Sequence, residues 1–227
     1  MKTAAVLAAM AMGSAAMAGV TFNDSQNELF ENGFAHLDIA SVTVDHDANN
    51  VYFSLTVRGD VDNPTWGKYC IGINAPGGVN VSGNGWGRNV NWNGQGIDYW
   101  IGTWADDGGS GFGGEVRQMN ADNSNNLLAA TYLGSAGFSG TAVGNTVTWS
   151  IARSMIGMSS DGTFTFDLIT TGGGNDPGVD HLSRSDSSTS AWGETSVSGN
   201  FLSYSIPAPS ALALLGLGGI AAGRRRR

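Results

Sequence analysis

The sequence predicts an all-β protein built as an antiparallel β-sandwich or barrel. Apolar and polar residues alternate along several short segments, which is the pattern of strands with one buried face. Clusters of Gly, Asn and Asp, such as Asn84-Gly85 and Asp161-Gly162, separate these segments as turns do. No long amphipathic helical pattern interrupts the series, which argues against a helical bundle or an α/β fold.

Eight segments carry the strand pattern. It is clearest where Val, Phe, Leu, Trp or Ile alternates with polar residues, at 51–57, 146–151 and 163–168. The remaining five strands are expected, in chain order, at 36–44, 68–74, 97–104, 127–133 and 200–205. Only residues 153–158 look helical, and six residues make a single connecting turn. Trp149, inside the second of the clear strands, is assigned to the core.

The order of three early segments resembles family 9 carbohydrate-binding modules and DOMON-like sandwiches. They are Leu37-Asp38-Ile39-Ala40-Ser41-Val42-Thr43-Val44-Asp45, Val51-Tyr52-Phe53-Ser54-Leu55-Thr56-Val57 and Tyr69-Cys70-Ile71-Gly72-Ile73-Asn74. The resemblance covers residues 35–170. It implies a jelly-roll-like sandwich that binds sugars or, in some members, haem, although no axial Met or His pair for haem can be named.

Composition excludes several classes of site. One Cys and three His among 227 residues cannot make a disulfide framework, a CxxC zinc site or an iron–sulfur cluster. The formal charge of −8 argues against nucleic-acid binding, which depends on clustered Lys and Arg. The 35 glycines are about twice the usual share and predict a loop-rich domain.

The first 18 residues have the features of a secretory signal peptide. Lys2 supplies a positive charge, residues 4–12 are an uncharged apolar run, and Ala16-Met17-Ala18 has the small-x-small form of a cleavage site. Cleavage after Ala18 makes Gly19 the first mature residue. An amphipathic cytosolic helix is the alternative, but the run has no polar face.

The last 21 residues, 207–227, combine a proline motif, a hydrophobic segment and a basic end. Pro207-Ala208-Pro209-Ser210 precedes an apolar stretch, and the chain closes on Arg224, Arg225, Arg226 and Arg227. As a helix, the 14 residues 210–223 are about 21 Å long, short against a hydrocarbon core of about 30 Å. The arginines can reach the cytoplasmic headgroups and leave the domain outside.

These three elements, in this order, resemble the PEP-CTERM sorting tail of exosortase substrates in Gram-negative bacteria. The sequence departs from the usual motif at Ala208, where the family carries Glu. The resemblance implies export through signal peptidase, membrane insertion through the C-terminal helix, recognition by an exosortase near Pro207 and Pro209, and delivery to the cell surface or extracellular matrix. The alternatives are a retained membrane anchor and a C-terminal helix docked on the domain.

Residues 19–206 then form one domain, because no Pro-rich or charged linker divides them. Removing Lys2 and the four terminal arginines from the 11 basic residues leaves six against 19 acidic residues, a formal charge of −13. A surface of that sign repels nucleic acid and suits a secreted protein that stays soluble or binds calcium.

A loop rich in Trp and Asn supplies the candidate binding residues. Sugars stack their C–H faces on flat aromatic rings and place their hydroxyls against amide or guanidinium groups. Residues 83–95 have that composition, and the carbohydrate-binding candidates are Trp66, Trp86, Arg88, Asn91 and Trp92. The alternative is that these Trp side chains are buried and anchor loops over the sandwich.

Asp176 and Asp180 lie four residues apart after three glycines. Hard oxygen ligands on a Gly-rich loop suit Ca²⁺, so the pair is a possible calcium site. The alternative is a turn formed by Asp176 before Pro177, with no metal.

No catalytic motif is found: the sequence has no HExxH, GxSxG or P-loop. We therefore expect a non-enzymatic protein of the cell surface or matrix that binds carbohydrate or associates with extracellular polymer. A secreted glycoside hydrolase or lyase and a purely structural surface protein are the alternatives.

Overall fold

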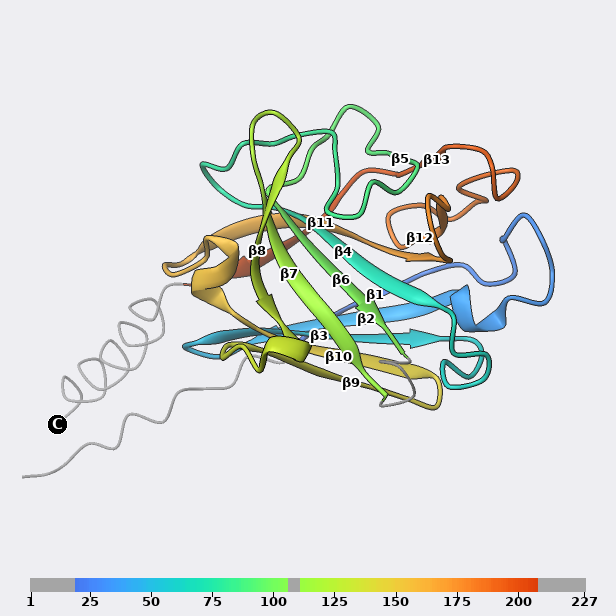
Figure 1. Cartoon of the computed structure of the whole chain (residues 1–227), viewed down its shortest axis with the longest axis horizontal. Helices are drawn as coiled ribbons and strands as arrows, with labels where there is room; N and C mark the ends of the chain where they lie inside the picture. Colours follow the sequence, from blue (N-terminus) through green and yellow to red (C-terminus); the bar gives the residue numbers. More distant parts are fainter. Residues whose placement is uncertain (1–18, 106–110, 208–227) are drawn as a thin grey trace, which may run out of the picture.

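A computed structural model describes residues 19–105 and 111–207. Two antiparallel sheets pack face to face (Figure 1). The smaller sheet contains, in spatial order, β1 (Val20–Asn23), β2 (Ile39–His46), β3 (Asn50–Val57), β10 (Thr146–Ala152) and β9 (Phe138–Val143). The predicted all-β sandwich is confirmed at this level.

The larger sheet contains, in spatial order, β12 (Gly178–His181), β11 (Gly162–Thr171), β4 (Lys68–Asn74), β6 (Tyr99–Trp104), β7 (Gly113–Met119) and β8 (Asn125–Ala130). The outer edge of β11 is shared, because β14 (Leu202–Ile206) pairs with residues 162–166 and β12 with residues 169–171. A parallel ribbon of β5 (Val90–Asn91) and β13 (Ser196–Val197) lies in the loops outside this sheet (Figure 1). The short 3₁₀ turns are η1 (Ala35–Leu37), η2 (Thr131–Leu133) and η3 (Arg153–Ile156).

The main core fills the space between the two sheets. Alternate residues of β3 point into it, and the predicted core residue Trp149 of β10 is buried there. Phe53 meets Phe166 of the larger sheet edge to face, with ring centroids 5.3 Å apart. Burial of this apolar surface stabilises the contact between the sheets.

A second core covers the outer face of the larger sheet. Cys70, Trp100 and Ile169 point outward from β4, β6 and β11, and loop residues including Trp92 pack over them. Trp86 lies on the backbone of Gly102, where a side-chain Cβ would collide with the indole ring. Both faces of the larger sheet are therefore buried, whereas alternation alone predicted one buried face.

The predicted segments match eight observed strands, and segment 68–74 coincides with β4. Pairing extends β11 three residues past its predicted end at 168. The sequence did not predict β1, β5, β7, β9, β12 or β13. The predicted Gly-rich loop that carries Asp176 and Asp180 needs correction, because residues 178–181 form β12 and pair with β11.

Within residues 19–105 and 111–207, no helix is long and apolar enough to cross a membrane. The predicted signal peptide, residues 1–18, lies outside the described residues, and so does the predicted tail from residue 208 onward. Pro207 is described, and Pro209 is not.

Replacing Trp92 with Ala should lower the free energy of unfolding by about 3–5 kcal/mol, because the indole is 1% exposed and its removal leaves a cavity in the second core. Urea unfolding measures the change. Tyr132→Ala is the control: this ring is 56% exposed, and its loss should change stability by about 0.5 kcal/mol or less. Equal effects of the two substitutions would contradict the second core.

Candidate functional site: an aromatic-walled cavity and a buried carboxylate cluster

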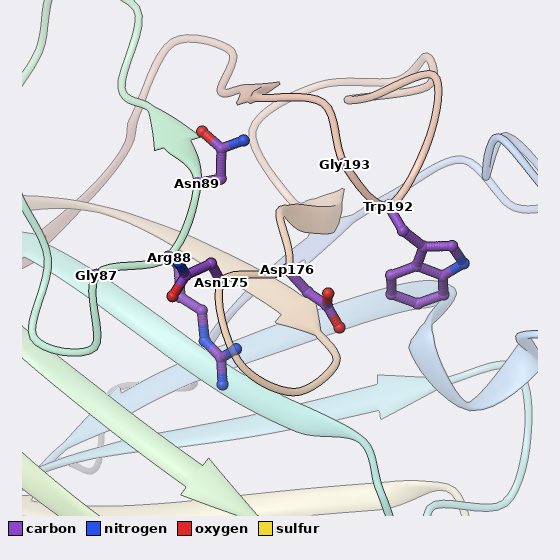
Figure 2. Close-up of a pocket in the computed structure, with 7 residues that line it drawn as sticks. All are labelled: Gly87, Arg88, Asn89, Asn175, Asp176, Trp192 and Gly193. Carbon is purple, nitrogen blue, oxygen red and sulfur yellow. The ribbon is translucent and has the colours of Figure 1, made fainter.

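A cavity of about 420 Å³ opens in the loops near the β5–β13 ribbon. Three segments line it, and each comes shortly before a strand: 87–89 before β5, 175–176 before β12 and 192–193 before β13 (Figure 2). Because the strands fix the ends of these segments, three stretches far apart in sequence meet at one place. The volume lies within the usual range for small-ligand sites.

Trp192 and Asp176 lie beside each other on one side of this cavity (Figure 2). Gly172 allows their approach: a Cβ at this residue would lie 3.2 Å from the Trp192 ring and closer still to the Asp176 carboxylate. A half-buried indole next to a carboxylate offers a ligand both a flat apolar face and a hydrogen-bond acceptor.

Arg88 ties two walls of the cavity together. Its guanidinium donates a hydrogen bond to the carbonyl of Gly174 and lies over the Trp86 ring at 5.3 Å from the centroid. The side chain is 8% exposed, and its Nε has no hydrogen-bond partner. An unpaired buried N–H is costly unless an ordered water reaches it.

Trp192 also belongs to an aromatic cluster, which it forms with Phe30, Phe34 and Trp66. Trp192 meets the other three rings edge to face, at centroid distances of 5.4 Å to Phe30, 5.2 Å to Phe34 and 5.9 Å to Trp66. The buried His36 ring packs on Trp66 at 4.6 Å, and burial lowers the pKa of His36. These contacts hold the orientation of Trp192.

Only some of the predicted carbohydrate-binding residues lie at or near the cavity. Arg88 lines the cavity, and Trp66 is 37% exposed in the aromatic cluster next to Trp192. Asn91 is exposed, accepts the Asn93 N–H at 2.9 Å and is not among the lining residues.

Trp86 and Trp92 have mainly packing contacts. Trp86 is half-buried against Trp100 and Trp104, and its Nε1 donates to Glu115. Trp92, 1% exposed, has no accessible ring face for a sugar, which corrects its expected role. Its Nε1 donates to the carbonyl of Gly83 at 3.3 Å, so it anchors the loop that was expected to bind.

Sequence reasoning missed Trp192. It is a lone Trp within the Ser-, Thr- and Gly-rich stretch 183–199, without a second Trp close by as in residues 83–95. An isolated Trp in a long polar loop was the available signal.

A second group of polar side chains meets at one point, and two of its members are close in sequence to Phe30 and Phe34. Carboxylate oxygens of Asp24, Glu28 and Asp180 lie within 4.8 Å of one another. Asp24 follows β1, Glu28 lies in the loop before η1, and Asp180 is on β12. Of the predicted calcium ligands, Asp180 joins this carboxylate cluster, whereas Asp176 lines the cavity instead.

The carboxylate cluster has few hydrogen bonds for its number of oxygens. Asp180 accepts the N–H groups of Ile39 at 2.7 Å and His181 at 2.8 Å. By contrast, one oxygen of Asp24 and both oxygens of Glu28 are buried without a partner. Burial raises the pKa of Asp24 to about 8 and also raises those of Glu28 and Asp180.

A third polar group has the connectivity of a nucleophile, base and acid. Ser196 Oγ lies 3.0 Å from His181 Nε2, and His181 Nδ1 lies 2.7 Å from Asp167 Oδ2. All three residues are 0% exposed, and Ser196 Oγ accepts the Gly178 N–H at 2.9 Å. No substrate carbonyl can reach this serine, so the network connects β11, β12 and β13 rather than forming a catalytic triad.

No family model, curated protein or solved structure matches the chain significantly.

The carboxylate cluster predicts how the stability of the protein changes with pH when a chelator such as EDTA keeps metal ions away. Folding raises the pKa of Asp24 from 3.8 to about 8, so the folded protein holds a proton that the unfolded chain releases. The contribution of Asp24 to the free energy of unfolding is therefore largest below about pH 4 and is lost as the pH rises toward 8. The charged groups around Asp24 are Glu28, Asp38, Asp167 and Asp180, and Arg58 acts on Glu28.

We expect the melting temperature in EDTA to fall between pH 5 and pH 8, and to fall less in Asp24→Asn. Thermal scans across this range measure both proteins. A melting temperature that rises with pH equally in both would contradict the raised pKa.

Proposed function

We propose that this protein is an exosortase-sorted, non-enzymatic protein of the cell surface or extracellular matrix of a Gram-negative bacterium, and that it binds carbohydrate in the cavity beside Trp192. The observation that carries the binding proposal is the combination of a half-buried indole with Asn89, Asn175, Asp176 and Arg88 around one cavity. An aromatic platform with amide and carboxylate groups at its edge is the chemistry that sugars require.

The proposed binding mode follows from the geometry of the wall. A pyranose ring stacks on the accessible face of Trp192, while its hydroxyls donate to Asp176 and exchange hydrogen bonds with Asn175 and Asn89. Trp66, exposed next to Trp192, extends the aromatic surface for a second sugar unit. The ligand would be a segment of polysaccharide rather than a single sugar.

The residues of the cavity support binding without hydrolysis. Most glycosidases place two carboxyl groups on either side of the scissile bond. Among the residues lining the cavity, Asp176 is the only carboxylate. The Ser196–His181–Asp167 network is buried beneath the surface and does not supply a nucleophile.

The sorting proposal depends on the two ends of the sequence. The signal peptide brings the chain to signal peptidase, and the C-terminal hydrophobic helix holds it in the membrane before processing. The resemblance to the PEP-CTERM tail implies an exosortase as the next partner. Polysaccharide binding after release would keep the domain with the extracellular polymer.

Trp192→Ala should weaken polysaccharide binding by tenfold or more, because removal of the stacking platform leaves only the polar contacts. Trp fluorescence and retention on immobilised glycans, including the polymer of the producing cells, measure binding. Tyr132→Ala removes another exposed ring, outside the cavity, and should bind as the wild type does. Absence of binding to every glycan, or release of shortened sugars, would overturn the proposed function.

Replacing Pro207 and Pro209 with Ala should leave the protein in the inner membrane, because the motif at the predicted processing site is lost. Cell fractionation and immunoblotting follow its location. A substitution of Pro177, which lies outside the tail, serves as the control for proline loss. Unchanged release of the double variant would refute exosortase processing.

A further inference from the structure

The carboxylate cluster gathers three acidic side chains, and several of their oxygens have no hydrogen-bond partner among the described residues. Asp24, Glu28 and Asp180 bring oxygens within 4.8 Å of one another. Arg58 is the basic residue whose charge acts on Glu28, and its Nε is already paired with Asp38 at 2.7 Å. Three carboxylates in partly buried surroundings repel one another, and a cation between them removes that cost.

Unpaired oxygens around the carboxylate cluster point independently to a missing partner. Asp38 is 0% exposed, and its Oδ2 accepts both the Arg58 guanidinium and the N–H of Asn27, next to Glu28. Its other oxygen, Oδ1, is buried and has no hydrogen-bond partner. Asp38 lies near the cluster, because it is bound to the residue before Glu28 and its charge acts on both Asp24 and Glu28. Buried acceptors without donors are rare unless an ion or a water is bound.

We propose that Asp24, Glu28 and Asp180 bind one Ca²⁺, which fixes the segment 24–38 against β12 and thereby holds the aromatic wall of the cavity. Asp24 Oδ2 and the two Glu28 oxygens are the unpaired ligand atoms. Asp180 is positioned for this role by the N–H groups of Ile39 and His181. Asp38 Oδ1 accepts a hydrogen bond from one of the waters that complete the coordination.

The donor set selects calcium. Ca²⁺ takes about six to eight oxygen ligands at about 2.3–2.6 Å, so two ligands on opposite sides of the ion are up to about twice that distance apart. The carboxylate oxygens of the cluster fit this spacing, because they lie within 4.8 Å of one another. Zn²⁺ prefers nitrogen and sulfur ligands, and the cluster contains none. Mg²⁺ requires a smaller octahedral shell and retains several waters.

The carboxylate cluster borders solvent on the side of Asp24. Asp24 and Ser25 line an open cavity of about 450 Å³ together with Ser183 and Arg184. The Arg184 guanidinium is paired with the exposed Asp186 at 2.8 Å, so its charge is compensated next to the opening.

The segment that the proposed ion would hold carries two of the aromatic residues that contact Trp192. Phe30 and Phe34 lie between Glu28 and Asp38 in the sequence, and both meet Trp192 edge to face. Loss of the ion frees the segment that supports Trp192. This link between the ion and ligand affinity rests on the proposed function, whereas ion binding itself does not.

Equilibrium dialysis with ⁴⁵Ca²⁺ on the purified full chain tests ion binding. We expect one Ca²⁺ per chain, and a tenfold or greater loss of affinity in Asp24→Asn and Glu28→Gln. Glu31→Gln is the matched control, because Glu31 lies on the same loop, is exposed and undergoes the same change of charge. Absence of Ca²⁺ binding in the wild type, or equal losses in Glu31→Gln and Glu28→Gln, would overturn the proposal.

Thermal unfolding tests the ion site by a second measurement, which does not require the variants to bind an ion. In EDTA, Glu28→Gln should melt at the same or a higher temperature than the wild type, because one repelling carboxylate is gone. With millimolar Ca²⁺ the order should reverse, because only the wild type gains a bound ion. A lower melting temperature of Glu28→Gln in both conditions, with the same increment on adding Ca²⁺, would contradict the ion site.

Glycan binding then separates the two proposals. Trp192→Ala should lose glycan binding and keep its Ca²⁺ affinity, whereas Glu28→Gln should lose Ca²⁺ and bind glycan at least threefold more weakly. Ca²⁺ binding without any glycan binding would refute the proposed function and leave the ion site standing. Equal glycan affinity in Ca²⁺ and in EDTA would refute the link between them.

Discussion

Buried negative charge at one edge of the sandwich is the constraint on which the candidate site depends. Asp24 and Glu28, on the segment after β1, and Asp180, on β12, bring their oxygens within 4.8 Å of one another. Burial raises the pKa of each, so the ionised cluster opposes folding unless a proton or a cation accompanies it. The chain between Asp24 and Asp38 carries Phe30 and Phe34, which meet Trp192 edge to face, so the proposed ion would support the aromatic residue that lines the cavity.

The loops over the larger sheet are held by buried side chains rather than by regular pairing. Trp92 and Trp100 form a second core with Cys70 and Ile169, and the Ser196–His181–Asp167 network joins three strands next to it. Such anchoring lets irregular segments keep a defined cavity on a rigid scaffold. The high glycine content has a matching use at Gly102 and Gly172, where indole rings or carboxylates approach the backbone.

The sequence predicted those parts of the fold that follow from local alternation. Segment 68–74 and the core position of Trp149 are examples, because β-strand periodicity and apolar content determine both. Strand β7 escaped prediction because Gly113, Gly114, Glu115 and Arg117 break the apolar pattern, and its pairing with β6 and β8 is not local. Likewise β12 was taken for a loop, since its two polar residues Asp180 and His181 are buried by tertiary contacts that the sequence does not display.

The candidate site was predictable only in part for the same reason. Composition drew attention to aromatic and acidic residues, and Arg88, Trp66 and Asp180 do lie at the cavity, in the aromatic cluster and in the carboxylate cluster. Composition could not distinguish the buried Trp92 from a binding Trp, nor reveal that Asp24 and Glu28 meet Asp180. The most direct measurement is a crystal structure of the protein grown with Ca²⁺ and analysed by anomalous scattering. We predict one peak among these three carboxylates, with Ca–O distances of about 2.3–2.6 Å; no peak, with the carboxyl groups hydrogen-bonded to one another, would contradict it.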